Sequence, residues 1–359
     1  MARKAYIPTD TERTAARISA QMKRRDLALV PASNPRFKVQ RVPSGSLTID
    51  RITGGGYARG RHVELYGDWS AGKSLLTYLC MILAQQRGEL CALVDGEHVF
   101  DQDWFKWLGG NLNNLLIYTP DTADELASVL QLFVYGDDEV ANVKVVGVDS
   151  VASMLPREEL EKDIQEGDDR VASLARLMSR LLRRVTTQND DTLFIWTNQW
   201  RDKISRIPGL RSTPGGRALG FYASVRVEMQ LGQKETAELQ VVKGAKWVTK
   251  KVPVGQWVNC TAAKNKLSTP LKEGSYLFNF NERGIDLVRE AVDLGMQDGI
   301  ITRVGDKAGV FTVHDAEGRE YKATGITRFL RILNTTPGLI EWVAACIEER
   351  TLEVANGGS

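Results

Sequence analysis

The 359-residue chain has little of what builds a disulfide scaffold, a metal cluster or a membrane span. It has three scattered histidines and only four cysteines, at positions 80, 91, 260 and 346, with no CxxC spacing. This pattern predicts neither a disulfide framework nor a zinc site and suits a reducing compartment. The longest apolar run, residues 75–84, is too short to span a bilayer, and the basic N-terminus lacks the apolar core of a signal peptide. We therefore expect a soluble, cytoplasmic protein.

Neither sign of charge is in large excess overall, because the formal net charge is only +2. The charges are unevenly distributed, however. Residues 1–45 contain ten Lys or Arg and three Asp or Glu, a local net charge of +7, and residues 200–217 contain five basic residues and one acidic residue, a local net charge of +4. The second segment also contains Gly and Pro, which keep it flexible. Such a segment suits the backbone and separated bases of single-stranded nucleic acid.

Apolar strand-like runs alternate with helical runs through the middle of the chain, which predicts an α/β fold with a central, mostly parallel sheet covered on both faces. After residue 225 the pattern predicts antiparallel hairpins. We expect three parts: residues 1–45, with a helix over 9–26 and a linker, residues 46–284, and a small α+β domain over 285–359. The expected strands are 61–66, 90–95, 114–118, 143–149 and 192–198, and the expected helices are 73–87, 101–108, 121–135 and 171–188.

The segment GDWSAGKS, residues 67–74, matches G-x-x-x-x-G-K-[ST] between an expected strand and an expected helix. Its backbone N–H groups and the helix N-terminus would bind phosphate. Lys73 would reach the β- and γ-phosphates, and the Ser74 hydroxyl would hold Mg²⁺, so we expect ATP and Mg²⁺ as cofactors. The alternative, a glycine-rich turn without a ligand, is disfavoured by the flanking pattern. The expected nucleotide contacts are Gly67, Asp68, Trp69, Ser70, Ala71, Gly72, Lys73, Ser74 and Leu75.

Two acidic residues lie at the carboxyl ends of two other expected strands. Asp149 ends the strand 143–149, where a metal-side carboxylate is required. Glu97 comes just past the strand 90–95, which we expect beside the phosphate-loop strand, and a carboxylate there can align or deprotonate an attacking water. Either residue could instead be an ordinary acid at the end of a strand. Their pairing with a phosphate loop favours roles in metal binding and hydrolysis.

An ordered series of motifs resembles the bacterial RecA-type strand-exchange recombinases over about residues 45–345. The motifs are SGSLTID, GRHVELYGDWSAGKS, VDGEHVFD, NLLIYTPDT, VVGVDSVASMLP, TNQWRDKI, PGGRALGFYASVR, KNKLSTP and AVDLGM. The resemblance implies a RecA-like P-loop ATPase core, an N-terminal segment that packs on a neighbouring subunit, and a small C-terminal domain. The N-terminal segment departs from the bacterial pattern, which fits a phage-encoded relative.

The resemblance also implies roles around the nucleotide. Glu97 matches the catalytic glutamate, and Gln199 matches the residue that senses the γ-phosphate and passes the signal to a DNA-binding loop. Asp101 and Trp104 fall where the family contacts adenine, with Trp in place of the usual Tyr, a ring that can still stack.

Two lysines in the segment KNK, Lys264 and Lys266, match family residues that reach the neighbouring subunit's ATP. By composition alone, this segment is a basic pair at a strand end, which is usually solvated. Nearby, Gly220 stands where many members carry Lys, while Phe221 matches a residue that couples neighbouring ATP sites.

Basic side chains also recur on the expected helix 171–188, where Arg176, Ser179, Arg180 and Arg183 share one face. The alternative is a solvated basic face. The resemblance makes this face a phosphate-binding surface, and makes Ile204 a wedge between bases and Gly215 and Gly216 phosphate-binding amides. The acidic segment 157–170 is not included among the expected DNA contacts. The expected DNA contacts are Arg176, Ser179, Arg183, Arg201, Lys203, Ile204, Gly215, Gly216 and Arg217.

These features together predict an ATP-dependent recombinase with DNA-stimulated ATP hydrolysis. It would form a helical filament on single-stranded DNA, pair it with homologous double-stranded DNA and exchange strands. One alternative is a ring-forming helicase or clock-type ATPase on the same core, against which KNK and PGGRALGFYASVR argue. Another is a DNA-binding scaffold that binds ATP without turnover, against which Lys73, Glu97 and Asp149 argue.

Overall fold

The computed structural model describes residue 13 and residues 31–34, 37–135, 142–157, 170–202, 211–243, 246–306 and 309–355. The chain forms two compact units, residues 1–40 and 41–359, and the description below concerns the second. The predicted helix over 9–26 lies outside the described residues except at Arg13, which is helical. Within these described ranges, no helix is both long enough and apolar enough to cross a membrane.

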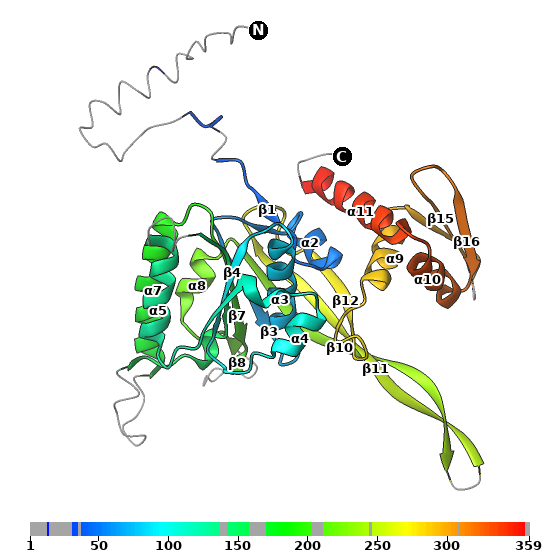
Figure 1. The fold of residues 1–359 in the computed structure, drawn as a ribbon, viewed down its shortest axis with the longest axis horizontal. Helices are drawn as coiled ribbons and strands as arrows, with labels where there is room; N and C mark the ends of the chain where they lie inside the picture. The colour runs from blue at the N-terminus through cyan, green and yellow to red at the C-terminus, as the bar shows by residue number, and fades with distance from the viewer. Residues whose placement is uncertain are drawn as a thin grey trace. The chain divides into compact units, whose positions relative to one another are not determined.

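A nine-stranded sheet forms the centre of the described part of residues 41–359 (Figure 1). The six strands from β10 to β5 are parallel to their neighbours, whereas β10 to β13 pair antiparallel. The predicted mostly parallel sheet with later hairpins is therefore confirmed. In spatial order the strands are β13 (Gly284–Ile285), β12 (Glu273–Asn279), β11 (Lys246–Asn265), β10 (Val225–Lys243), β3 (His62–Gly67), β7 (Leu193–Gln199), β6 (Val143–Asp149), β4 (Leu90–Asp95) and β5 (Leu115–Tyr118).

The strand order corrects one prediction. The strand that precedes Glu97, β4, was expected beside the phosphate-loop strand β3, but β7 and β6 lie between them. The reason is that a parallel sheet needs a crossover connection between consecutive strands, and such a crossover can leave room for strands that come later in the chain. The sequence order of strands therefore does not determine their spatial order.

Helices cover both faces of the sheet, and each face has its own core. On one face, Ile49 and Leu76 pack with the strands, and on the other, Leu130, Met178 and Leu219 do so. The first face carries α2 (Leu47–Thr53), α3 (Lys73–Gln85) and α4 (Gln102–Trp107), and the second carries α5 (Ala123–Tyr135), α7 (Arg170–Gln188) and α8 (Arg217–Tyr222). Smaller elements are β1 (Arg41–Val42), which pairs with β2 (Tyr57–Ala58), and the 3₁₀ turns η2 (Leu112–Asn114) and η3 (Val151–Ser153).

The C-terminal region has a third core, in which Phe311 stacks on Phe329. It contains three antiparallel strands and three helices, as the sequence predicted for a small α+β region. These are α9 (Leu287–Gln297), β14 (Ile301–Val304), β15 (Val310–His314), β16 (Glu320–Thr324), α10 (Ile326–Thr335) and α11 (Leu339–Ala355).

A buried carboxylate joins this region to the first turn of α2. Glu290 on α9 accepts hydrogen bonds from the Ser46 hydroxyl (2.5 Å) and from the backbone N–H groups of Leu47 and Thr48 (3.2 Å each). Ser46 in turn caps α2 by accepting from the N–H of Ile49. One side chain therefore satisfies helix-terminal N–H groups that have no partner within the helix.

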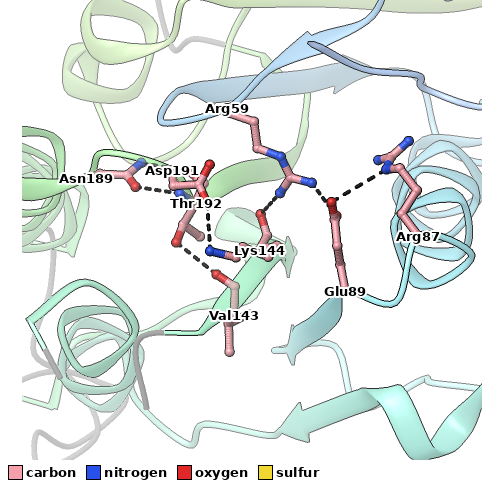
Figure 2. A network of polar contacts seen from close by, with 8 residues as sticks. All are labelled: Arg59, Arg87, Glu89, Val143, Lys144, Asn189, Asp191 and Thr192. Atoms are coloured by element: carbon pink, nitrogen blue, oxygen red, sulfur yellow. Dashed lines mark hydrogen bonds and ion pairs between the residues drawn. The ribbon is translucent and has the colours of Figure 1, made fainter. Parts of the chain in front are cut away.

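A polar network connects the amino-terminal ends of three parallel strands (Figure 2). Arg59 forms an ion pair with Glu89, next to β4, and donates 2.6 Å to the main-chain oxygen of Lys144 on β6. Lys144 forms an ion pair of 2.7 Å with Asp191, next to β7. The phosphate loop lies at the carboxyl end of β3, and this network lies at the opposite, amino-terminal ends of the strands. We therefore assign the network a structural role.

Candidate functional site

The phosphate loop lies at the carboxyl end of β3 and leads directly into α3. Gly67 has φ +142°, and a Cβ there would lie 1.9 Å from the main-chain oxygen of Met229 on β10, so no larger residue fits without a backbone shift. Gly72 caps α3 in the left-handed region, with φ +82°. The predicted strand, loop and helix are thus in place, and the N-terminus of α3 faces the loop.

Lys73, the first residue of α3, folds back over this loop. Its ammonium group donates a 2.6 Å hydrogen bond to the main-chain oxygen of Asp68. Burial lowers the pKa of Lys73, while the carboxylates of Asp149, Glu97 and Asp68 act in the opposite direction. The lysine charge therefore lies between the loop and the acidic side chains of the neighbouring strands.

Asp149 ends β6 and is held by two hydroxyl groups. Ser74 donates 2.5 Å to Asp149 Oδ2, and Thr197 on β7 donates 2.6 Å to Asp149 Oδ1. Burial raises the pKa of Asp149, and the hydrogen bonds from both hydroxyls oppose this shift. Hydroxyl and carboxylate oxygens are suitable ligands for Mg²⁺, which usually takes few protein ligands and completes its shell with phosphate and water oxygens. The donor set fits such an ion.

Glu97 reaches the same place although β4 is two strands away from β7. Its Oε1 accepts hydrogen bonds from the Ser150 hydroxyl and from Gln199 Nε2, the latter at 3.2 Å. The turn after β4 is held by Asp95, which accepts from the N–H groups of Glu97 (3.2 Å) and Phe100 (2.9 Å). The expected acid and the expected sensor are therefore in direct contact. Ser150 was missed by sequence reasoning, although it directly follows Asp149.

The two residues expected at adenine lie at the start of α4, where Asp101 is the N-cap and Trp104 is the third residue. Asp101 caps this helix by accepting from the N–H groups of Asp103 (2.9 Å) and Trp104 (3.0 Å), and the hydrogen bond from Trp104 is the main cause of its lowered pKa. The half-buried Trp104 ring lies 5.4 Å from the Tyr78 ring, edge-on, and 5.7 Å from the Arg283 guanidinium. Contact with adenine stays a prediction.

Tyr276, which was not identified from the sequence, hydrogen-bonds to the backbone of the phosphate loop. Tyr276 on β12 is fully buried, and its hydroxyl donates 2.9 Å to the main-chain oxygen of Ala71. A Cβ at Gly72 would lie 2.6 Å from this hydroxyl oxygen. Tyr276 is about two hundred residues away in sequence and has no motif around it, so only the fold places it here.

Lys264 and Lys266 do not lie at the phosphate loop of their own chain. Lys264 pairs with Arg226, which pairs with Glu64 near the start of β3, whereas the loop follows the end of β3. The Lys264 ammonium group donates to the main-chain oxygens of Gly220 (2.7 Å) and Phe221 (2.8 Å). Burial and the neighbouring cation Lys266 lower the pKa of Lys264 to about 8.

The two predicted DNA-binding stretches meet on α7. On this helix Arg176 and Arg183 are exposed and Ser179 is half-buried. A groove of about 500 Å³ runs past Arg176 and Ser179 and is also lined by Asp124 and Pro156. Arg176, Ser179 and Arg180 therefore line one groove on α7, and contact of this face with DNA stays a prediction.

The second stretch ends close to that helix, and its start pairs with its end. At its base, β8 (Arg201–Asp202) pairs antiparallel with β9 (Arg211–Ser212). Gly215 and Gly216 have φ +82° and +74°, and a Cβ at Gly216 would lie 2.7 Å from Ala175 on α7. Gly216 and Arg217 then start α8. The expected contacts Lys203 and Ile204 lie outside the described residues.

Comparison with known proteins agrees with this geometry. The family model described as "RecA N-terminal domain" matches residues 12–286. The chain is 35% identical to "Protein RecA" of Thermus thermophilus over 324 residues, which cover 89% of this chain and 88% of the relative. It is 35% identical to "Protein RecA" of Zymomonas mobilis over 334 residues (90% and 85% coverage). It is 34% identical to "Protein RecA" of Cereibacter sphaeroides, also over 334 residues (92% and 91%).

Proposed function

Because this chain belongs to the RecA family and is an ATP-dependent DNA recombinase that carries out strand exchange, we propose that it acts as a helical filament on single-stranded DNA, with ATP and Mg²⁺ held at the phosphate loop. As a family member it binds nucleotide and DNA, forms filaments and is a DNA-dependent ATPase. Family membership argues against a ring-forming helicase and against a scaffold without turnover. We further propose pairing of the bound strand with double-stranded DNA, and a cytoplasmic location.

In this proposal the residues around β3 bind and orient the nucleotide. The loop amides and Lys73 hold the phosphate oxygens, and Ser74 and Asp149 hold Mg²⁺, which neutralises phosphate charge when bound. Glu97 orients and deprotonates the attacking water. The close contacts among these side chains support the assignment, because each group lies within reach of one shared space at the carboxyl ends of β3, β6 and β7.

The observation that carries the link to DNA is the contact between Glu97 and Gln199. Gln199 is the last residue of β7, and the basic segment follows directly. A γ-phosphate that competes with Glu97 for the Gln199 amide would move the root of this segment. DNA would be bound along the groove that contains Arg176 and along the adjoining glycines, of which Gly216 approaches Ala175, the neighbour of Arg176 in α7.

Contacts between subunits complete the proposal. Lys264 and Lys266 lie toward the opposite end of β3 from the phosphate loop, so their predicted role at ATP requires a neighbouring subunit's loop. They would neutralise charge on the transferring phosphoryl group. We propose that residues 1–45 pack on the adjacent subunit, that residues 46–284 form the ATPase core, and that residues 285–359 form the small C-terminal domain.

The test is single-stranded DNA binding by fluorescence anisotropy, with and without a non-hydrolysable ATP analogue, combined with electron microscopy of the complex. We expect the analogue to tighten binding and to produce helical filaments. In Gln199→Ala, DNA would bind weakly and the analogue would no longer tighten binding. The matched control is Gln131→Ala on α5, whose side-chain amide contacts Ala127 and Arg184 instead. A full ATP-dependent gain in Gln199→Ala would contradict the sensor role.

A further inference from the structure

A buried carboxylate lies on the phosphate-loop strand, three residues before Gly67. Glu64 is fully buried. Its Oε2 accepts a 2.6 Å hydrogen bond from Arg226 Nε on β10, and its Oε1 accepts a 3.1 Å hydrogen bond from Asn198 Nδ2 on β7. A buried charge is costly unless it is paired and hydrogen-bonded, so both partners are needed to keep it there. Neither of these two partners is among the residues assigned to nucleotide or DNA.

Asn198 is the residue through which Glu64 reaches the DNA-binding segment. The Nδ2 group of Asn198 also donates 3.1 Å to the main-chain oxygen of Pro214, and its Oδ1 accepts 3.0 Å from the N–H of Gln199. Gln199 and Pro214 are the two ends of the segment 199–214. One amide side chain therefore holds the start and the end of this segment together, and Glu64 fixes the direction in which that amide points.

A second contact lies nearer the phosphate loop, between β3 and the residue that follows β7. Tyr66, on the same face of β3 as Glu64, has its ring 5.0 Å from the Trp200 ring, edge-on, and 4.5 Å from the Arg226 guanidinium. Arg226 also pairs across the strands with Lys264, whose ammonium group contacts the end of α8. Glu64 thus lies between Asn198, at the base of the segment 199–214, and Arg226, the ladder partner of Lys264.

We propose that Glu64 is a positioning residue for the coupling of ATP to DNA binding. Held by Arg226, its carboxylate orients Asn198, and Asn198 sets both ends of the segment 199–214 relative to the strand that carries the phosphate loop. A movement of Gln199 is then transmitted through Asn198 to Pro214 as well as to the residues directly after Gln199. This inference rests on the proposed role of Gln199 as the nucleotide sensor.

The main test is the ATP-dependent gain in affinity for single-stranded DNA in Glu64→Gln, which keeps the shape and removes the charge. We expect the gain to fall about tenfold or more, the factor that corresponds to loss of a hydrogen bond to a charged group. Binding of a fluorescent ATP analogue without DNA should change little. Because Asn198 mediates the effect, the Glu64→Gln/Asn198→Ala double variant should be no worse than Asn198→Ala alone.

A matched control separates this role from general stabilisation. Glu89 is also paired with an arginine, Arg59, at the amino-terminal ends of the strands of the same sheet (Figure 2). Glu89→Gln should leave the ATP-dependent gain intact. If Glu64→Gln folds poorly, Glu64→Asp provides the same test, because it keeps the charge for Arg226 but withdraws the carboxylate from Asn198.

Three results would overturn the proposal: a full gain in the Glu64 variants, an equal loss in Glu89→Gln, or full additivity of Glu64→Gln with Asn198→Ala. Failure of the proposed function is a separate result. If the wild-type chain shows no ATP-dependent gain, the sensor mechanism fails and the positioning role fails with it. If the wild type gains affinity and Gln199→Ala does not, a wild-type response in Glu64→Gln overturns the positioning role only.

Discussion

The ammonium group of Lys73 donates a 2.6 Å hydrogen bond to the main-chain oxygen of Asp68, at the other end of the phosphate loop. The lysine therefore closes the loop on itself, which places its charge at the loop that we propose holds the phosphate oxygens. The nearby carboxylates of Asp149 and Glu97 favour the charged ammonium form against the effect of burial on its pKa.

Lys73→Ala should abolish ATP hydrolysis and strand exchange. Loss of one contact to a charged group costs about 1.5–3 kcal/mol in binding, and the cost is larger in the transition state. Steady-state ATPase and strand-exchange assays check this. Lys144→Ala is the control, because Lys144 lies in the ion-pair network at the amino-terminal ends of the strands, away from the phosphate loop. Near-normal turnover in Lys73→Ala would refute the phosphate-loop assignment.

Glu97→Gln should bind ATP and DNA but hydrolyse ATP roughly 100-fold more slowly, since the amide keeps the shape and cannot act as a base. Filaments on DNA should therefore persist in the presence of ATP, which electron microscopy and a disassembly assay would detect. Unchanged hydrolysis would mean that another acid orients the water. Asp95, which holds the turn around Glu97, would be the next residue to change.

Arg176→Ala should reduce the slope of log affinity against log salt for single-stranded DNA by about 0.7, the value for one phosphate contact. Arg184→Ala on the same helix is the matched control, because Arg184 donates to Gln131 on α5. Anisotropy titrations over a salt series measure both slopes. Equal changes in the two variants would show that the effect is a general loss of positive charge and not a contact of Arg176.

Lys264→Ala should be inactive alone but active in mixtures with Lys73→Ala. A filament that mixes the two variants contains interfaces at which an intact phosphate loop meets an intact lysine pair of the adjacent subunit. Partial recovery of DNA-stimulated ATPase activity on mixing checks this, with mixtures of Lys73→Ala and Glu97→Gln as a control that should not recover. No recovery with Lys264→Ala would place the lysine's role within its own chain.

Glu290→Gln should change the pH dependence of stability. Burial raises the pKa of Glu290 to about 7 from a usual value of 4.5. Between these values the folded chain retains a proton that the unfolded chain has lost, so the wild type loses stability as pH rises from about 4.5 to 7, by roughly 3 kcal/mol. The glutamine variant should lack this loss. Thermal unfolding of both proteins from pH 5 to pH 8 measures the difference, and parallel curves would contradict it.

The strand, loop and helix around residues 67–74 and the position of Asp149 at the end of β6 could be predicted because their signals are local. The glycine spacing, the following lysine and serine, and the apolar strands around them are read within a few residues, and the strands β4 and β6 were placed with their observed bounds. The long β10–β11 hairpin was also visible in the pattern. By contrast, α2 and α8 were not predicted as helices, since each is short and lies beside or contains glycine, which is typical of turns.

What the sequence alone determined is therefore the identity of the elements, the phosphate loop and the family, because short-range spacing and turn chemistry encode them. Only the tertiary structure decided which elements are neighbours. It placed β7 and β6 between β3 and β4, brought Glu97 to Gln199, put Tyr276 in contact with the loop backbone, and joined Glu64 to both ends of the segment 199–214 through Asn198. The physical reason is that strand order depends on crossover connections and on burial of both faces of the sheet, which are properties of the whole chain.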